Sequence, residues 1–349
     1  MRSFASRFLL CLLVIAGSVT ACQPLGAAVP IGMTVHYRGA DSASLDDQFD
    51  ALAAMKVTWV RVDVDWSVLE PVHNQLNWTS TDQLVDRALA HRMRVLLVLA
   101  FSPPWTTGAT GSNRARPDDP AAFANFARVA AQRYAARGVH HWEVWNEPNT
   151  GKFWPPAPDV AEYGRLFRAA ADAVRGVDPK ATLLIGGLSP TYGSPTADVD
   201  PVTYLGRLYD DGAAQIADGI AVHPYTFPYM PFGRSQRTTG GFRDLPALHD
   251  LMVARGDGDK KVWITEYGAP TGTGPYAVSE HDQAVTLLQA RQHVDTWDWA
   301  GPLIYYELVD GGTDPDEIED NFGVLRTDGS LKLAAVALID TAADPLSGG

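Results

Sequence analysis

The sequence predicts a single-domain α/β fold, a (β/α)8 barrel of the TIM-barrel type. Apolar, β-rich runs alternate with helical patterns from residue 31 almost to the C-terminus. The runs are nearly continuous in Val, Ile and Leu, as expected of parallel strands that are buried on both faces. Two of them end in a glutamate with Pro or Gly one or two residues later, namely Glu147 before Pro148 and Glu266 before Gly268. Eight strand–helix units in 349 residues fit one barrel, which typically needs roughly 250 residues or more.

Each predicted strand is followed by a helix with recognisable end signals. Asp119 is an N-cap candidate, with Pro120 at the first helical position. Ser279 with Asp282 resembles a capping box before the helix that follows the seventh strand, and residues 331–342 supply the last helix. The eight strands are expected at residues 31–37, 59–66, 94–101, 140–147, 182–189, 219–225, 261–267 and 302–308.

The connections that follow the strands are long, whereas those that lead into strands are short. Barrel enzymes place their sites at the end where the strand-to-helix connections lie. Each aromatic ring there is as consistent with simple packing as with ligand contact. As a set, the rings favour a groove in which sugars stack, because a pyranose presents an apolar C–H face to an aromatic ring. The long connections are residues 102–117, 148–159, 226–243 and 309–330, and their rings include Trp105, Phe153, Trp154, Phe227, Tyr229 and Phe232.

The charge of the chain argues against some partners. The formal net charge is −13, and loss of an N-terminal segment with Arg2 and Arg7 makes it more acidic still. This balance disfavours nucleic acid and peripheral binding to anionic lipid, and it is neutral toward an uncharged sugar.

The N-terminus resembles a bacterial lipoprotein signal. Arg2 and Arg7 precede an apolar stretch at residues 8–16 that is too short for a membrane span, and small residues then lead to Cys22. We expect residues 1–21 to be a lipoprotein-type signal peptide, the thiol of Cys22 to be lipidated, and residues 22–30 to be a tether. The protein would then be an exported lipoprotein on the extracytoplasmic side of the cell membrane.

The alternative is ordinary signal-peptidase cleavage after the small residues 19–21, which would give a secreted protein. In either case Cys11 is lost with the signal, so no cysteine pair remains to form a disulfide. The catalytic domain, residues 31–345, must therefore be held together by its core.

The two strand-end glutamates predict a reaction. Carboxylates at the ends of different strands of one barrel can face each other across its mouth. Double-displacement glycoside hydrolysis needs such a pair, one acid/base and one nucleophile, about 5–5.5 Å apart. Two ionised carboxylates at that distance repel, so one of them holds a proton until the other becomes esterified.

Three stretches resemble a known group of enzymes, the clan A retaining glycoside hydrolases. Within the clan the chain is most similar to glycoside hydrolase family 39, in its bacterial endoglycosidase branch, with family 5 as a near alternative. The resemblance implies that Glu147, after the fourth strand, is the acid/base and that Glu266, after the seventh, is the nucleophile. The stretches are residues 59–71, which include Trp59–Trp66 and Glu70–Pro71, residues 142–149 and residues 321–329.

The resemblance and the strand pattern also suggest substrate-binding residues. By resemblance, Asn146 donates to the sugar 2-hydroxyl and Tyr225 is hydrogen-bonded to the nucleophile. Arg61 shares strand parity with two aspartates and would point into the barrel, either toward Glu266 or into a structural Arg–Asp pair. His223 shares parity with Tyr225 and is either a substrate contact or a packing residue. The remaining predicted contacts are aromatic, namely Trp105, Trp154 and Tyr306, the last where many clan members have tryptophan.

Other acidic residues carry weaker interpretations. Glu143 shares parity with Glu147 and would be a buried structural acid, while Glu307 is a rival for the nucleophile. An acidic run in residues 310–320 lacks the regular ligand spacing of a calcium loop and is expected to be a solvated loop. We expect no metal and no organic cofactor.

The functional hypothesis is a monomeric glycosidase that acts, preferentially within the chain, on a cell-envelope or extracellular polysaccharide. Exo-action, cleavage of furanosides and transglycosylation use the same residues and stay open. A catalytically dead surface protein that only binds glycan is the non-enzymatic alternative. The sequence does not encode the sugar, its linkage or its ring size.

Overall fold

The computed structural model describes residues 28–108, 111–191, 197–233 and 239–343. Eight parallel strands pair in sequence order, and the eighth pairs with the first, so the sheet closes into a barrel. This confirms the predicted (β/α)8 fold. The strands are β1 Ile31–Thr34, β2 Trp59–Asp65, β3 Arg94–Ala100, β4 His141–Val144, β5 Thr182–Leu188, β6 Gly219–Val222, β7 Lys261–Ile264 and β8 Ala300–Tyr305.

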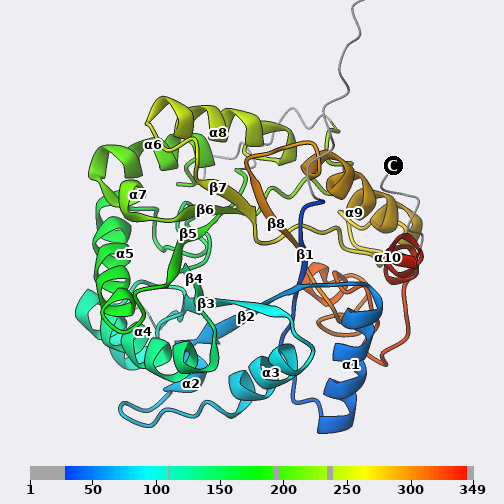
Figure 1. Ribbon diagram of the computed structural model, residues 1–349, viewed down its shortest axis with the longest axis horizontal. Coiled ribbons are helices and arrows are strands. Elements are labelled where there is room, and N and C mark those ends of the chain that lie inside the picture. Colours follow the sequence, from blue (N-terminus) through cyan, green and yellow to red (C-terminus); the bar gives the residue numbers. More distant parts are fainter. Residues whose placement is uncertain (1–27, 109–110, 192–196, 234–238, 344–349) are drawn as a thin grey trace, which may run out of the picture.

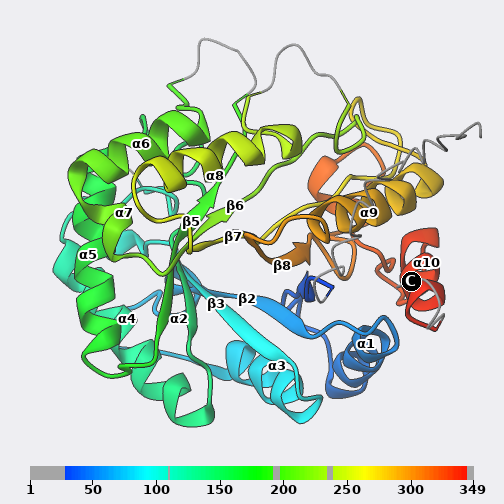
Figure 2. The same ribbon diagram turned by 45° about the horizontal axis from the view of Figure 1, so that its top comes forward.

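The helices surround the barrel as an outer ring, and α10 lies between α9 and α1 where the ring closes (Figures 1 and 2). Short 3-10 helices cover residues 104–106, 135–137, 242–244 and 318–320. The α-helices are α1 Ser42–Ala54, α2 Trp66–Leu69, α3 Thr79–Ala90, α4 Pro120–Tyr134, α5 Val160–Arg175, α6 Pro201–Asp211, α7 Ala213–Ile216, α8 Leu245–Ala254, α9 Glu280–Val294 and α10 Leu333–Ala343.

The predicted helix starts are confirmed by their hydrogen bonds. The Asp119 carboxylate accepts from the amide of Ala121 at the start of α4, with Pro120 at the first helical position. Ser279 Oγ accepts from the amide of Asp282 and donates to its carboxylate at the start of α9. These caps satisfy amides that no helical carbonyl can reach.

The strand ends differ from the sequence prediction where the site begins. The fourth strand was expected to run to Glu147, but β4 ends at Val144 because Trp145 and Glu147 adopt positive φ values of 72° and 46°. A left-handed backbone turns the chain away from the ladder. Similarly, β7 ends at Ile264, two residues before Glu266. Both glutamates therefore lie just beyond their strands.

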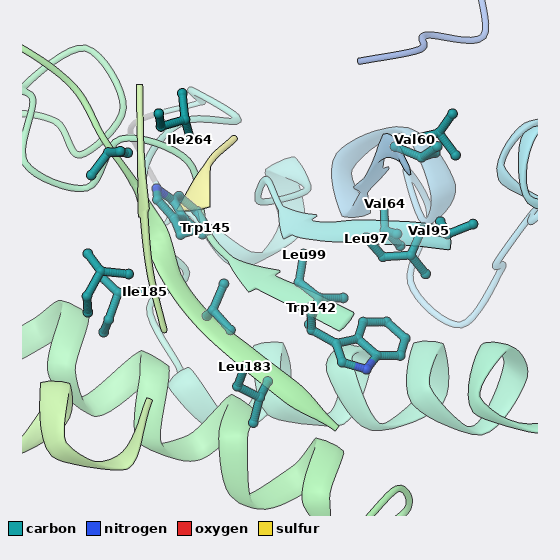
Figure 3. Close-up of a cluster of buried hydrophobic side chains, with 14 of the residues drawn as sticks. Val60, Val64, Val95, Leu97, Leu99, Trp142, Trp145, Leu183, Ile185 and Ile264 are labelled. Carbon is teal, nitrogen blue, oxygen red and sulfur yellow. The ribbon is translucent and has the colours of Figure 1, made fainter. Parts of the chain in front are cut away.

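Apolar side chains fill the space between barrel and helices and the lower part of the barrel itself. Figure 3 shows part of the outer core, with Trp142, Trp145, Leu97, Leu99 and Ile185 among its labelled residues. Inside the barrel, a separate apolar cluster closes the end away from the site; it consists of Trp59, Leu96, Leu184, Ala221, Trp263 and Ile304.

The predicted signal peptide, residues 1–21, lies outside the described residues, as do Cys22 and the tether up to residue 27. In the part of the chain that is described, none of the helices combines the length and the apolar character needed to cross a membrane.

Candidate active site

Glu147 lies at the barrel mouth in the turn that follows β4. Its side chain is 12% exposed. The turn is fixed from below by Asn149, whose amide nitrogen donates to the carbonyls of Ser189 and Val199 at 2.7 and 2.8 Å. The loop after β4 is thus tied to the loop after β5, which holds Glu147 in place.

Glu266 lies beyond β7 and carries hydrogen bonds on both carboxylate oxygens. Arg61 Nη1 donates to Oε1 at 2.6 Å, and the Tyr225 hydroxyl donates to Oε2 at 2.9 Å. Position 268, two residues after Glu266, must be glycine, because a Cβ on Gly268 would lie 2.0 Å from the carbonyl oxygen of Tyr306. The Glu-Tyr-Gly motif therefore permits the close approach of the loops after β7 and β8.

The carboxylates of the two glutamates lie close to each other at the barrel mouth. Oxygen atoms of Glu147 and Glu266 and a ring nitrogen of His223 lie within 4.8 Å of one another. Such a separation is close to the spacing of about 5–5.5 Å between the two carboxyl groups of a retaining glycosidase, and it leaves less room than the 6.5–9.5 Å of an inverting one.

His223 lies between the two carboxylates and is fully buried. Its Nδ1 is 3.0 Å from Glu147 Oε1 and 3.5 Å from Glu266 Oε2, and its Nε2 is 3.1 Å from Thr265 Oγ1. Burial acts to lower the pKa of His223, but the carboxylates of Glu266, Glu143 and Glu147 outweigh it and raise this pKa to about 9. The ring is therefore an imidazolium at neutral pH. Since both of its nitrogens then carry protons, this group of three residues is a poor metal site despite its spacing.

A buried ionic layer supports the site from inside the barrel. Arg61 Nε and Nη2 donate to Glu143 at 3.0 and 3.2 Å, and the Gly187 amide donates to Glu143 Oε1 at 2.8 Å. Burial acts to raise the pKa of Glu143, but Arg61 and His223 lower it to about 2. Gly187 cannot carry a side chain, since a Cβ would lie 2.0 Å from His223 Nε2. Glu143 is thus the buried structural acid that strand parity predicts.

Three of the predicted substrate contacts are buried, and of the two orientations expected for Arg61 the structure shows the one toward Glu266. Arg61 is 1% exposed and His223 is fully buried, so both contact the carboxylates rather than open space. Arg61 also pairs with glutamates and not with the aspartates of its own strand. Trp154 is 1% exposed, and its ring packs at 5.4 Å from Trp145 and 5.7 Å from that of Tyr163. It belongs to the core because the loop after β4 folds inward over α5.

The other predicted contacts stay near the mouth. Asn146 is 8% exposed and its Oδ1 accepts from Arg61 Nη2 at 3.2 Å, which directs its amide nitrogen away from the arginine. Trp105 is 36% exposed, and its ring packs against that of His73 with a tilt of 31° and 4.2 Å between the centroids. Tyr306 is half-buried, 6.4 Å from the ring of Tyr225.

Sequence reasoning missed a polar group at the rim next to β1. Glu307 is fully buried, contacted by Arg38 Nη2 at 2.5 Å, and lies 3.3 Å from His36 Nε2. Burial raises the pKa of Glu307 to about 8 against the opposing effect of Arg38. His36 Nδ1 is 3.5 Å from Asp63 Oδ2. Only the alternation of side chains along a strand could have suggested this group, because the positions of Thr34, His36 and Asp63 share the inward face of their strands.

An exposed ion pair crosses the mouth. Lys152, in the loop after β4, lies 3.5 Å from Glu319, in the loop after β8. The two side chains are 54% and 56% exposed, so the pair contributes no more than about 1 kcal/mol and can open. Beside it, the ring of Phe153 stacks on Phe101 at 6.0 Å and forms an aromatic wall near Glu147.

The acidic run after β8 is partly structural, which corrects the prediction of a solvated loop for its first member. Asp310 is buried and accepts from the buried Lys332 at 2.7 Å and from the amide of Gly323 at 2.9 Å. Asp314 and Asp320 are exposed or half-buried and take part in hydrogen bonds to loop amides.

Comparisons with known proteins show similarity to glycoside hydrolases. The family model described as cellulase (glycosyl hydrolase family 5) matches residues 24–301. A β-xylosidase from Geobacillus stearothermophilus is 33% identical over 134 residues, which are 34% of this chain and 25% of that protein.

Solved structures share the fold. A family 39 glycoside hydrolase from Bacteroides cellulosilyticus WH2 has a TM-score of 0.70 at 23% identity, covering 90% of this chain and 64% of the other. A monomeric β-xylosidase from Caulobacter crescentus CB15 has a TM-score of 0.68 at 19% identity, covering 92% and 69%. The chain thus matches a quarter of the curated relative and less than two thirds of the first of these structures.

Proposed function

The chain belongs to the cellulase family, glycosyl hydrolase family 5, and from that premise we propose that it is a retaining glycosidase that cleaves β-linked O-glycosyl bonds. The resemblance to clan A glycoside hydrolases, with families 39 and 5 as candidates, is confirmed by the family match and by the family 39 neighbour of the fold. The relative named as a β-xylosidase supports the β configuration of the bond. The observation that carries the proposal is the pair of carboxylates within 4.8 Å, both close to Nδ1 of His223.

In the first step, Glu266 attacks the anomeric carbon and forms a glycosyl ester while the bond to the leaving oxygen breaks. Glu147 gives its proton to that oxygen. In the second step, Glu147 takes a proton from water, the water oxygen attacks the anomeric carbon, and the carboxylate of Glu266 leaves. Configuration is retained because the two displacements each invert it.

The contacts of the two residues fit these different roles. Arg61 and Tyr225 donate to the two oxygens of Glu266, which orients the carboxylate and compensates its charge before attack. The His223 imidazolium donates to Oε1 of Glu147. Glu147 Oε2 has no hydrogen bond within the described part of the chain, so this oxygen is the one available to exchange a proton with the substrate.

We further propose that the substrate is an extracytoplasmic polysaccharide and that the enzyme is anchored through Cys22. The signal-like N-terminus supports export, and the aromatic wall of Phe101 and Phe153 supports binding of sugar rings on the leaving-group side. The Lys152–Glu319 pair across the mouth favours the second candidate, exo-action at a chain end, but an exposed pair of this kind is weak.

The proposal is tested by trapping the nucleophile. A mechanism-based epoxide inhibitor should label Glu266, Glu266→Gln should abolish hydrolysis of aryl glycosides, and NMR of the first product should show retained configuration. Glu147→Gln should spare substrates with a good leaving group, because these need no protonation. A label on Glu307, or inversion in the product, would refute the assignment. Folded protein that binds glycan without cleaving any of these substrates would support the binding-only alternative.

A further inference from the structure

We propose that the leaving-group side of the site binds a sugar with an anionic substituent, a carboxylate or a sulfate, through Arg114 and Lys152. The inference rests on the proposed glycosidase function and deepens it, because it names the substrate class as an acidic, β-linked glycan. It concerns the sugar that departs when the bond is cleaved.

Two cations from different loops meet at one aromatic ring. Arg114 belongs to the connection after β3, and its guanidinium carbon lies 4.8 Å from the centroid of the Phe153 ring. Lys152 belongs to the loop after β4, and its Nζ lies 5.1 Å from the same centroid. Both distances are within the roughly 6 Å at which an aromatic face attracts a cation. The two positive charges are therefore gathered at one place on the barrel mouth.

This place lies beside the acid/base. The Thr150 amide donates to the Glu147 carbonyl at 3.0 Å, and the Phe153 amide donates to the Thr150 carbonyl at 3.3 Å. Two consecutive turns thus lead from Glu147 to the ring, which also packs on Phe101 after β3 with 6.0 Å between the centroids.

The departing sugar lies on the same side of the site. In a displacement the leaving oxygen is opposite the attacking carboxylate, so the departing sugar extends away from Glu266. Glu266 follows β7, and β3 lies across the barrel from β7. A sugar that leaves past Glu147 therefore comes to the ring of Phe153 and its two cations.

Both cations are available to an anionic ligand. Arg114 is exposed, and within the described part of the chain no acidic side chain pairs with it. A guanidinium that lies on a ring keeps its in-plane N–H groups free for a bidentate anion. Lys152 pairs with Glu319 at 3.5 Å, but both side chains are more than half exposed, and such a pair is weak enough to exchange for another anion.

The charge of the whole chain gives these two cations their importance. The sequence has 41 acidic and 28 basic residues, so its surface as a whole repels an anionic polymer. Asp198 also lies beside the loop after β4, but its Oδ1 is directed to the backbone, where it accepts from the Gly151 amide at 2.8 Å. Arg114 and Lys152 offset the repulsion where the departing sugar lies.

The test compares neutral and anionic leaving units. The probes are β-(1→4)-linked disaccharides with glucose, xylose or mannose as the glycone and methyl glucoside, methyl glucuronide or methyl glucoside 6-sulfate as the leaving unit. Each exposed charge contact contributes a factor of roughly 2–5, so kcat/KM for one anionic probe should exceed that for its neutral counterpart at least about fourfold. Comparison of glucuronide with sulfate identifies the preferred anion. The ratio should fall by about half or more from 0.01 M to 1 M salt, where the Debye length shrinks from about 30 Å to about 3 Å.

Charge-removing variants locate the effect. Arg114→Gln and Lys152→Gln should each lower the ratio of anionic to neutral kcat/KM about two- to fivefold. Glu319→Gln should raise the ratio about twofold, because it releases Lys152. The matched controls Arg92→Gln and Lys56→Gln remove the same charges from exposed positions in the links before β3 and β2, at the other end of the barrel, and should leave the ratio unchanged.

The outcomes separate the anionic subsite from the glycosidase function. A ratio below about fourfold in the wild type, or equal losses on neutral and anionic probes in the double variant Arg114→Gln/Lys152→Gln, would overturn the subsite and leave the glycosidase function intact. Cleavage of 4-nitrophenyl β-glycosides of the same sugars without cleavage of any anionic probe would do the same. If folded protein cleaves neither the disaccharides nor the 4-nitrophenyl glycosides, the proposed function itself fails, and the subsite with it.

Discussion

Removing the Arg61 guanidinium should destabilise the fold strongly, because it leaves a carboxylate buried without its cation. Arg61→Met keeps the length and volume of the side chain but removes four hydrogen bonds, to Glu143, Glu266 and Asn146. The pKa of Glu143 is about 2 in the folded protein, against an ordinary 4.5. At 1.36 kcal/mol per tenfold change in the protonation equilibrium, that difference corresponds to about 3 kcal/mol.

The expected loss is a large share of the roughly 5–15 kcal/mol that stabilises a typical domain. For a domain of this size, about 3 kcal/mol corresponds to a fall in Tm of roughly 6–12 °C, measurable by calorimetry at pH 7. Activity should fall by about tenfold or more as well, since Glu266 loses a charged hydrogen bond of 2.6 Å. Arg255→Met is the control: its partner Asp210 is 67% exposed, and the expected loss is below about 1 kcal/mol.

The sign of the pH dependence sharpens the test. A lowered carboxyl pKa gives stability that is complete above about 4.5 and is lost as the pH falls toward 2. The difference in Tm between wild type and Arg61→Met should therefore shrink as the pH falls below 4.5. Adding Glu143→Gln to Arg61→Met should recover part of the loss, because no charge is then buried alone. A variant as stable as wild type at pH 7, or a difference that does not depend on pH, would refute this account.

The remaining predictions concern neighbouring contacts. Tyr225→Phe should lower kcat/KM on aryl glycosides by about 10- to 200-fold without a change in fold, because Glu266 loses a hydrogen-bond donor worth about 1.5–3 kcal/mol. An unchanged kcat/KM would show that the 2.9 Å hydrogen bond has no catalytic effect. His223 has a raised pKa of about 9, so its contribution to stability is complete below 6.5 and is lost as the pH rises to 9. Wild type should therefore lose stability over that range in denaturant titrations, and His223→Gln should show a flatter profile. Lys332→Met should cost about 3–5 kcal/mol in the same titrations, because Asp310 remains buried without its cation; a loss below 1 kcal/mol would contradict the buried pair.

Local patterns explain why much of the fold was predictable. Parallel strands that are buried on both faces appear in the sequence as apolar runs. Helix starts appear as capping residues such as Asp119 and Ser279, whose side chains accept hydrogen bonds from amides no more than three residues away. Each predicted strand overlaps an observed one. The end of β4 was wrong because positive φ values at Trp145 and Glu147 stop pairing, and no residue type in that stretch signals them.

The candidate site was predictable only in part. Strand parity placed Arg61 inside the barrel, but it could not choose between aspartate and glutamate partners, since Glu143 and Glu266 are 82 and 205 residues away. Trp154 was misassigned because loop aromatics look alike in sequence whether they line a groove or pack into a core. The polar group of His36 and Glu307 was missed for the same reason, as its members are 271 residues apart.

The sequence alone thus determined the barrel, the two glutamates at strand ends and the reaction class that they imply, because periodicity, caps and strand-end motifs depend on near neighbours along the chain. Tertiary structure alone decided that His223 bridges the carboxylates, that Arg61 and Tyr225 hold Glu266, and that Arg114 and Lys152 meet at the ring of Phe153. These features depend on which strands close the barrel together and on how each loop folds over its mouth, and neither is written in local sequence.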